Sequence, residues 1–360
     1  MVGISSNYIK ADFGLSDSMA NALGMMLFFW FLVLSVPAGV FMGKIGRKNT
    51  VVLSVAATAA AMLIPSIDYS FALMMLSFAL LGIGNTLLQV SINPLVADIV
   101  PPSKLASSLT LGQFVKAIAS FAAPIVALRC AAAFGNWKLV YPMFAAVAVA
   151  AAVWLFFVKI EERAPEKNST LFECLSLLKK PAVAFLFFGI LVHVGIDVGV
   201  NMTSPKILME RAGMTLSEAG YAVSLYFIMR TAASFAGAII LTKVSAKAFF
   251  AASVAIMAAA SAGLIFAGGE TALYVCIALM GIGNANIFSV IFSRALQIMP
   301  SHNNEISGLM VMGIAGGGIF PLAMGLASDA FASQTGAAAI IALCVIYLAF
   351  LAPKLGVRNA

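Results

Sequence analysis

Two stretches of this chain, far apart in the sequence, are nearly identical. Residues 79–85 read Ala-Leu-Leu-Gly-Ile-Gly-Asn and residues 278–284 read Ala-Leu-Met-Gly-Ile-Gly-Asn, an offset of 199 positions. The same offset carries Gly14 onto Gly213. A chance match would not join an apolar stretch and a distant glycine at one spacing, so the sequence indicates an internal duplication. We expect the chain to fold as two copies of one unit.

The apolar composition predicts that both copies lie in a membrane. Hydrophobic residues make up 62% of the 360 residues and charged residues only 10%, whereas roughly 45–50% of a soluble domain is apolar. Apolar windows of about 20 residues, enough to cross a hydrocarbon core of ~30 Å, lie near residues 19–42, 49–67, 70–99, 105–133, 139–159, 181–203, 216–242, 247–267, 271–297, 304–332 and 336–354. Glycine and proline are expected to break several of these helices, as at Gly84, Pro94 and Gly316. The predicted fold class is an all-α integral membrane protein with eleven spans.

The charge pattern predicts topology rather than a polar ligand. The net charge of +7 comes from basic residues scattered at the ends of apolar stretches, which argues against nucleic acid as a partner. Alternate loops that hold Lys44, Lys48, Lys243 and Lys247 carry most of these residues, and the positive-inside rule places them in the cytoplasm with the carboxyl terminus. The four cysteines have no metal or redox spacing. No cofactor and no metal site are expected.

The offset also predicts how many helices each copy contains. It carries the third span onto the ninth, so each copy has six spans and the two copies are parallel. The partner of span 181–203 would then end near residue 4 and lie almost wholly upstream of Met1. We expect that one amino-terminal helix is missing, through truncation or a misplaced start codon; the alternative is a native eleven-span protein. The predicted domains are an N-terminal bundle of five spans (1–159), a cytoplasmic linker (160–180) and a C-terminal bundle of six spans (181–360).

A loop after the first span carries a recognisable pattern. Residues 39–48 read Gly-Val-Phe-Met-Gly-Lys-Ile-Gly-Arg-Lys, which resembles the loop signature G-x-x-x-D-R-x-G-R-K of the major facilitator superfamily of transporters. Parallel six-helix halves joined by a charged linker are also similar to that superfamily. The resemblance implies the major facilitator fold and a gating loop that contains Gly39, Lys44, Gly46, Arg47 and Lys48. Gly43 stands where the family usually has Asp, so the latch formed by this loop lacks one carboxylate.

A narrower resemblance is to the fucose/glucose/galactose branch of the superfamily. Residues 89–94 read Gln-Val-Ser-Ile-Asn-Pro and match the Q-V-x-x-N-P pattern of its fourth helix, while residues 109–113, 286–293 and 308–321 are similar to its fifth, tenth and eleventh helices. The resemblance implies a sugar transporter that works by alternating access and is commonly coupled to protons or, in some members, to sodium. The fucose permease type has a carboxylate at the position of Gln89, so here that position cannot carry a proton.

Four ionisable side chains lie at bilayer depth, where burying a charge costs roughly 2.5–3.5 kcal/mol. They are Lys116, His193, Asp197 and Arg230, and we expect them to face partners or a wet cavity. His193, Asp197 and Asn201 share one stripe of a helix at i, i+4 and i+8. Asp197 is the leading candidate for proton coupling, with His193 and Arg230 beside it. The alternatives are a permanent ion pair of Asp197 with Arg230 or Lys116, and a packing role for His193.

Neutral amides suit a sugar, because they offer directional hydrogen bonds without a buried charge. The predicted substrate-binding residues are Gln89, Asn93, Gln113, Lys116, Asn201 and Asn286. Lys116 stands where the sugar branch usually has Asn, which admits a carboxylated substrate such as a uronic or sialic acid. Asn85 and Asn284 are expected to tie helices together rather than bind substrate.

Three functions follow from these residues. The first is symport of a hexose-like sugar or sugar derivative with a cation, either the proton or sodium, by a monomer in the bacterial inner membrane. The alternative is a major facilitator transporter or exporter of another small solute, such as an organic anion or a sugar acid. A membrane enzyme that uses His193 and Asp197 as metal ligands is disfavoured, because neither a third ligand nor a nucleophile motif is evident.

Overall fold

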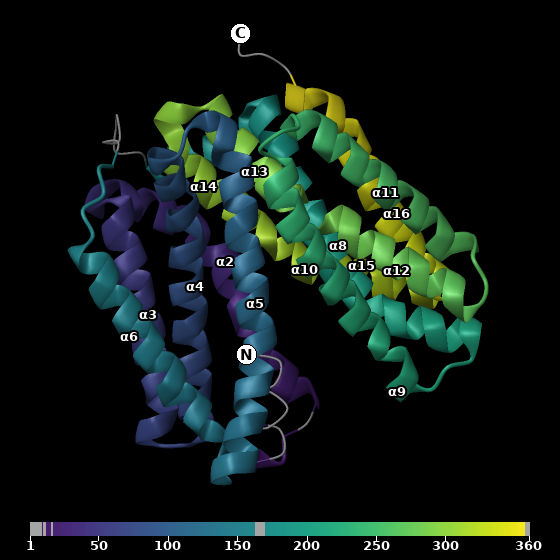
Figure 1. The fold of residues 1–360 in the computed structure, drawn as a ribbon, viewed down its shortest axis with the longest axis horizontal. Coiled ribbons are helices and arrows are strands. Elements are labelled where there is room, and N and C mark those ends of the chain that lie inside the picture. The colour runs from purple at the N-terminus through teal and green to yellow at the C-terminus, as the bar shows by residue number, and fades with distance from the viewer. Residues whose placement is uncertain (1–8, 10–11, 16, 163–169, 357–360) are drawn as a thin grey trace. The chain divides into compact units, whose positions relative to one another are not determined.

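The described chain is entirely helical (Figure 1). The computed structural model describes Ile9 and residues 12–15, 17–162 and 170–356, and no strand occurs among them. The longer helices of the first copy are α2 (Asp17–Ile45), α3 (Arg47–Ile67), α4 (Phe71–Ile99), α5 (Pro102–Phe134) and α6 (Val140–Phe157), followed by the short α7 (Leu171–Ser176). Those of the second copy are α8 (Pro181–Ala212), α9 (Leu216–Ala219), α10 (Tyr221–Ile240), α11 (Ala246–Phe266), α12 (Glu270–Asn284), α13 (Ile287–Ile298), α14 (Asn303–Met312), α15 (Gly316–Phe331) and α16 (Thr335–Leu351). Single turns of 3-10 helix lie at Trp137–Leu139, Leu177–Lys179, Pro300–His302, Gly313–Ala315 and Ala352–Gly356.

The helices coincide with the predicted membrane spans. Among the described residues, nine helical segments are long and apolar enough to cross a membrane. The other two predicted spans coincide with α2 and α5, whose side chains are only partly described. The expected partner of α8 lies outside the described residues. The all-α membrane class is therefore confirmed, and a count of eleven crossings stays a prediction.

Of the helix breaks predicted at Gly84, Pro94 and Gly316, the structure has the one near Gly316 and lacks the other two. α4 continues from Phe71 to Ile99 through Gly84 and Pro94, so the break predicted there is wrong. In the second copy the helix ends at Asn284 and restarts as α13, and a 3-10 turn at Gly313–Ala315 separates α14 from α15. Pro94 removes one helical hydrogen bond without breaking α4, because another donor takes the acceptor that it leaves, as described below.

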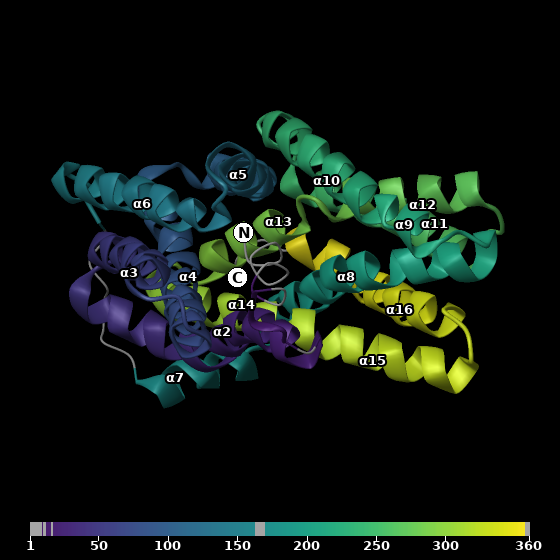
Figure 2. The same cartoon turned by 90° about the horizontal axis from the view of Figure 1, so that it is seen from below.

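The helices form two compact units. One comprises Met1–Ile99, Val115–Leu177 and Met299–Met312, and the other comprises Val100–Phe114, Leu178–Ile298 and Gly313–Ala360. The units differ from the predicted bundles in two segments. Residues 299–312, which include α14, belong to the first unit, where α14 lies beside α2 and α4 (Figure 2). The start of α5 belongs to the second unit, where Ser107 Oγ donates a hydrogen bond to the Ala238 carbonyl at 2.6 Å.

The duplication is visible in backbone geometry within each unit. Gly14 and Gly213 both have positive φ, at 60° and 67°, a conformation that favours glycine at the end of a helix. A Cβ added to Gly84 would lie 3.0 Å from the carbonyl oxygen of Ser54, and one added to Gly283 would lie 2.8 Å from that of Ser253. Both pairs are related by the offset of 199, so the motif glycines allow α4 to approach α3, and α12 to approach α11, in the same way.

Candidate functional site

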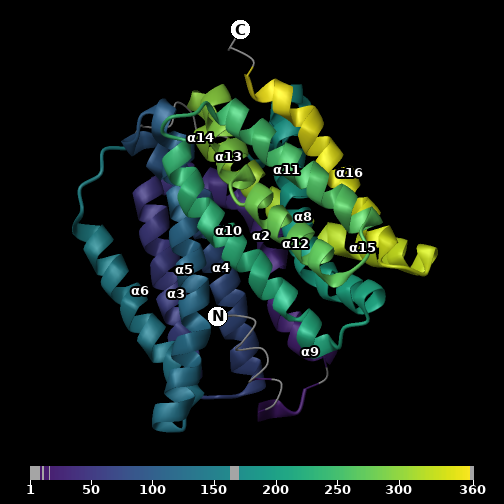
Figure 3. The same cartoon turned by 45° about the vertical axis from the view of Figure 1, so that its right-hand side comes forward.

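A polar cluster joins α8, α10 and α12 of the second unit, which lie side by side in Figures 1 and 3. Asp197 on α8 accepts a hydrogen bond from the Tyr226 hydroxyl at 2.6 Å and pairs with Arg230 Nη1 at 3.0 Å. Asn284 donates from Nδ2 to the Tyr226 hydroxyl at 2.9 Å and to Asp197 Oδ1 at 3.4 Å. His193 Nδ1 lies 2.8 Å from Asn284 Oδ1. The structure thus joins three predicted coupling residues to a tyrosine and an asparagine.

Helical spacing and glycines assemble this cluster. His193 and Asp197 are four residues apart on α8, as are Tyr226 and Arg230 on α10, so each pair occupies one helix face. A Cβ on Gly281 would lie 2.7 Å from the Tyr226 carbonyl oxygen, so α12 and α10 come into backbone contact there. That close approach brings Asn284, the last residue of α12, to the polar groups of both neighbours.

The hydrogen bonds determine which nitrogen of His193 carries its proton. Because the Asn284 amide nitrogen donates to Tyr226 and Asp197, its oxygen is the acceptor of the remaining bond. The proton therefore lies on His193 Nδ1, and the hydrogen bonds connect His193 to Asp197 through Asn284. In this geometry, the hydrogen bond from His193 holds the Asn284 side chain in position. Among the described residues, no group of three His, Cys, Asp or Glu side chains could hold a metal ion.

The two ends of the cluster differ in exposure. His193, Tyr226 and Asn284 are at most 2% exposed, whereas the side chains of Arg230 and Asp197 are 26% and 17% exposed. The ionic end therefore keeps access from outside the protein while the neutral end is sealed.

The loop before α3 forms a second cluster, within the first unit. Arg47 is 5% exposed; its Nε donates to Asn304 Oδ1 of α14 at 2.8 Å, and its Nη1 pairs with Asp98 at the end of α4. Glu162 accepts from the backbone N–H groups of Arg47 and Lys48 at 2.6 and 2.8 Å. These N–H groups begin α3 and have no helical acceptor, so Glu162 caps the helix. Carboxylates from two other segments therefore surround the loop in which Gly43 replaces Asp.

Glycines bring α14 against α2 in the same unit. A Cβ on Gly39 would lie 2.7 Å from the Asn304 carbonyl oxygen, and one on Gly308 would lie 2.8 Å from that of Ser35. Gly46 has φ +90° just before Arg47, which explains the glycine in the loop pattern. Lys44 is exposed, and Lys48 Nζ donates to the Phe156 carbonyl of α6 at 2.9 Å.

A sequence model of the Major Facilitator Superfamily matches residues 1–320. The chain belongs to this superfamily. It is 28% identical to the glucose/galactose transporter of Brucella abortus, over 95% of this chain and 87% of that protein. It is 21% identical to a putative glucose/galactose transporter of Helicobacter pylori, over 96% and 90% of the two chains. The predicted family and its branch are thereby confirmed.

Solved structures of the superfamily share the fold. The fucose:proton symporter of E. coli superposes with a TM-score of 0.86 at 20% identity, over 99% of this chain and 96% of that one. The human organic anion transporter superposes with a TM-score of 0.70 at 15% identity, over 98% and 88% of the chains. The major facilitator fold, which the family resemblance implies, is therefore confirmed.

The branch pattern on α4 serves packing within the first unit. Pro94 has no N–H, so the carbonyl of Val90 loses its helical donor, and Ser307 Oγ of α14 donates to that oxygen at 2.5 Å. Asn93 Nδ2 donates to the Gln89 carbonyl at 2.9 Å, and both side chains are buried. Gln89 and Asn93, predicted to bind substrate, thus lie one turn apart on a helix that α14 contacts.

Two other predicted ligands in this major facilitator chain have an unsatisfied oxygen. Asn201 Nδ2 donates to the Asp197 carbonyl at 2.7 Å, and Asn286 Nδ2 donates to the Ala233 carbonyl at 3.0 Å. Within the described structure, Oδ1 of each is buried and accepts no hydrogen bond. A buried acceptor without a donor is costly, so both oxygens are suited to accept a hydrogen bond from a hydroxyl group of a ligand.

Gln113 and Lys116 share a face of α5, with Gln113 half-buried and Lys116 exposed. They fall on opposite sides of the boundary between the compact units, so their convergence with Gln89 stays a prediction.

Sequence reasoning did not single out Tyr226 for the polar cluster; the available signal was its position one turn before Arg230. Asn284 does join helices, as expected, and it also contacts the ionic pair.

Proposed function

We propose that this chain is a monomeric sugar transporter of a bacterial inner membrane that moves a hexose-like sugar by alternating access together with a proton. The relatives that carry glucose/galactose names are bacterial and match nearly the whole chain. A structure with the same fold is named a fucose:proton symporter. The observation that carries the proposal is the Asp197 cluster, a carboxylate held by Arg230, Tyr226 and Asn284 at bilayer depth.

Asp197 is proposed to carry the proton. In the observed arrangement the Asp197 carboxylate pairs with Arg230 Nη1 at 3.0 Å. When Asp197 takes up a proton, its attraction for Arg230 disappears, and α8 and α10 lose the ion pair that joins them. Tyr226 and Asn284 keep the neutral carboxyl group in place, because both can still hydrogen bond to it. Proton uptake thereby changes the contact between two helices, which is what coupling requires.

The hydroxyl groups of the sugar are proposed to donate hydrogen bonds to the unsatisfied oxygens of Asn201 and Asn286. Asn201 also donates to the backbone of Asp197, so a sugar bound there would lie one helical turn from the proton carrier. Gln89 and Asn93 of α4 and Gln113 of α5 are proposed as further sugar ligands. This arrangement links substrate to carboxylate through one side chain.

Uptake into proteoliposomes with a panel of neutral hexoses, with and without an inward proton gradient, tests the proposal. We expect Asp197→Asn to keep exchange of sugar across the membrane but to lose accumulation driven by the gradient. Glu210→Gln, which removes a carboxylate near the end of the same helix, is the matched control and should accumulate sugar normally. Gradient-driven accumulation by Asp197→Asn would show that Asp197 does not couple transport to protons. A lack of hexose transport by the unmodified chain would refute the proposal that a hexose is the substrate.

A second candidate substrate is a sugar acid or another organic anion. It is favoured by Lys116, an exposed cation in the middle of α5 where the sugar branch usually has Asn. The test compares uptake of a uronic acid and of the parent hexose by the unmodified chain and by Lys116→Asn. A preference for the acid that disappears in the variant would support this candidate. A preference for the neutral hexose in both proteins would exclude it.

A further inference from the structure

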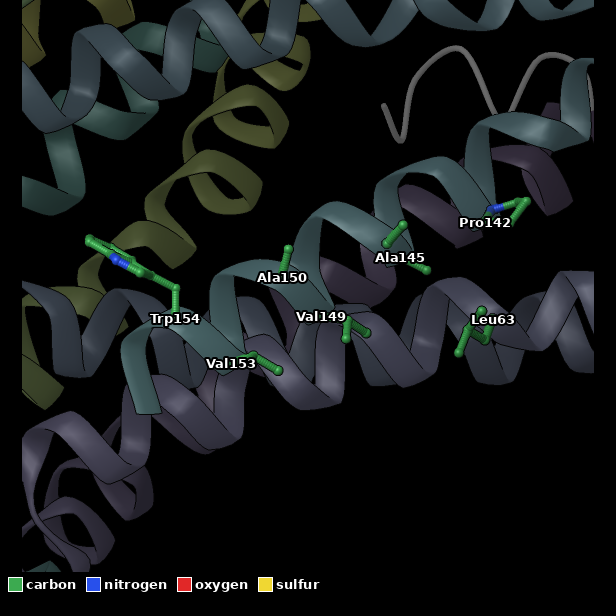
Figure 4. Close-up of a pocket in the computed structure, with 8 residues that line it drawn as sticks. Leu63, Pro142, Ala145, Val149, Ala150, Val153 and Trp154 are labelled. Carbon is green, nitrogen blue, oxygen red and sulfur yellow. The ribbon is translucent and has the colours of Figure 1, made fainter. Parts of the chain in front are cut away.

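An apolar groove lies on the surface of the first unit, between α3 and α6. It has a volume of about 620 Å³, and side chains along α6 from Pro142 to Trp154 line it together with Leu63 of α3 (Figure 4). Ala146 and Ala150 are too small to fill the space between the two helices. The groove has no part in either cluster described above, so it is a feature that transport chemistry does not explain.

The surface of α3 and α6 that carries the groove is suited to contact with lipid hydrocarbon. α3 and α6 are both long and apolar enough to span a membrane, and only 17% of the most apolar window of α6 is buried, the smallest share among the nine candidate spans of the described residues. From Pro142 to Trp154 the lining advances by twelve residue steps along α6. At 1.5 Å per residue this is about 18 Å, close to the ~15 Å of one leaflet's hydrocarbon. One acyl chain would extend along the whole groove.

One end of the groove is suited to a phospholipid head group. Trp154 is 71% exposed, and tryptophan favours the boundary between hydrocarbon and head groups. Beyond it, Lys159 is exposed and Lys48 Nζ bonds to the end of α6 at the Phe156 carbonyl. We propose that the groove binds one acyl chain of an anionic phospholipid whose phosphate lies against Lys159 and Lys48. Because Lys48 follows Arg47, this lipid would contact the gating loop directly.

Native mass spectrometry of the full chain, purified and mixed with phosphatidylglycerol, tests the site. Ala146→Trp fills the groove, and we expect it to weaken retention of the lipid about tenfold. Val147→Trp is the matched control: Val147 is 65% exposed at the same depth and does not line the groove, since the next residue of a helix lies about 100° around it. This variant should retain the lipid as the unmodified chain does. Equal retention by all three proteins would overturn the proposal.

Lys159→Glu tests the head group separately. We expect the unmodified chain to retain phosphatidylglycerol in preference to phosphatidylcholine, and the variant to lose most of that preference. An unchanged preference would overturn the phosphate contact. A dimer that forms in place of lipid adducts, and that Ala146→Trp abolishes, would show that a second copy of the chain occupies the groove. If Ala146→Trp does not fold, as judged by circular dichroism, Ala150→Leu replaces it.

Discussion

The two copies of the Gly-Ile-Gly-Asn motif share their packing but differ in what the asparagine contacts. Gly84 and Gly283 meet equivalent backbone carbonyls, so the helix approach is duplicated. Asn85 lies inside an unbroken helix, whereas Asn284 ends α12 and contacts Asp197 and Tyr226. The positions equivalent to Tyr226 and Arg230 hold Leu27 and Phe31 in the first copy. The difference teaches that the glycines of the motif serve helix packing in both copies, whereas the contact of the asparagine with Tyr226 depends on residues that the first copy does not repeat at positions 27 and 31.

In the helical turns that follow the motif, it is the first copy that carries the polar side chains. Gln89 and Asn93 of the first copy correspond by the same offset to Phe288 and Phe292. In the second unit the Phe288 ring lies 5.3 Å from that of Phe292 and 6.2 Å from that of His193, measured between centroids. One copy thus carries amides where the other carries aromatic rings, one of them beside the neutral end of the polar cluster. We infer that substrate contacts and proton coupling are divided unequally between the copies, as the proposed function requires.

The largest expected effect comes from breaking the ion pair in the copy that has it. Arg230→Met leaves Asp197 without its cation and should destabilise the protein by roughly 3 kcal/mol. Phe31→Met, at the equivalent buried position of the first copy, should cost less than about 1.5 kcal/mol. Thermal unfolding of the purified proteins measures both. Adding Asp197→Asn to Arg230→Met should restore most of the loss, and failure to do so would mean that Arg230 acts by packing alone.

The second prediction concerns what the copies share. Gly84→Ala and Gly283→Ala should each destabilise by ~1–3 kcal/mol, because the added methyl group would overlap backbone and side-chain atoms in both. Gly325→Ala on α15 is the control, since a Cβ there meets nothing within 4 Å; it should be neutral or slightly stabilising. A loss in only one copy would contradict the view that the motif is duplicated packing.

His193 offers a smaller test, on the neutral end of the cluster. His193→Phe leaves the Asn284 oxygen without a donor and should cost roughly 1–3 kcal/mol, with weaker sugar uptake. His193→Gln retains a donor and should restore much of both. The pH dependence of uptake should be the same in both variants and in the unmodified chain, because His193 positions Asn284 rather than carrying the proton. A shifted pH profile in His193→Gln would contradict this assignment.

Helix positions could be predicted from the sequence far better than contacts between helices. The apolar windows gave the spans because hydrocarbon thickness sets their length. The cost of a buried charge identified Asp197 and Arg230 but did not choose between Arg230 and Lys116 as the partner, since that depends on which helices touch. Glu162 lies 115 residues from the N–H group of Arg47 that it caps. No local pattern marks such a contact, nor the pairing of Ser307 with the carbonyl freed by Pro94.

The smallest expected effect is at the exposed turn that precedes α10. Thr215 donates its hydroxyl and backbone hydrogens to Glu218 at 2.7 and 2.9 Å, and these hydrogen bonds hold the pKa of the Glu218 carboxyl below its usual value. A lowered pKa in the folded state stabilises the protein above the unfolded pKa, and this contribution is lost as the pH falls through the folded value. Glu218→Gln should therefore lower the unfolding temperature slightly at neutral pH and progressively less in acid. An effect that grew as the pH fell would mean that the charge of Glu218 opposes folding.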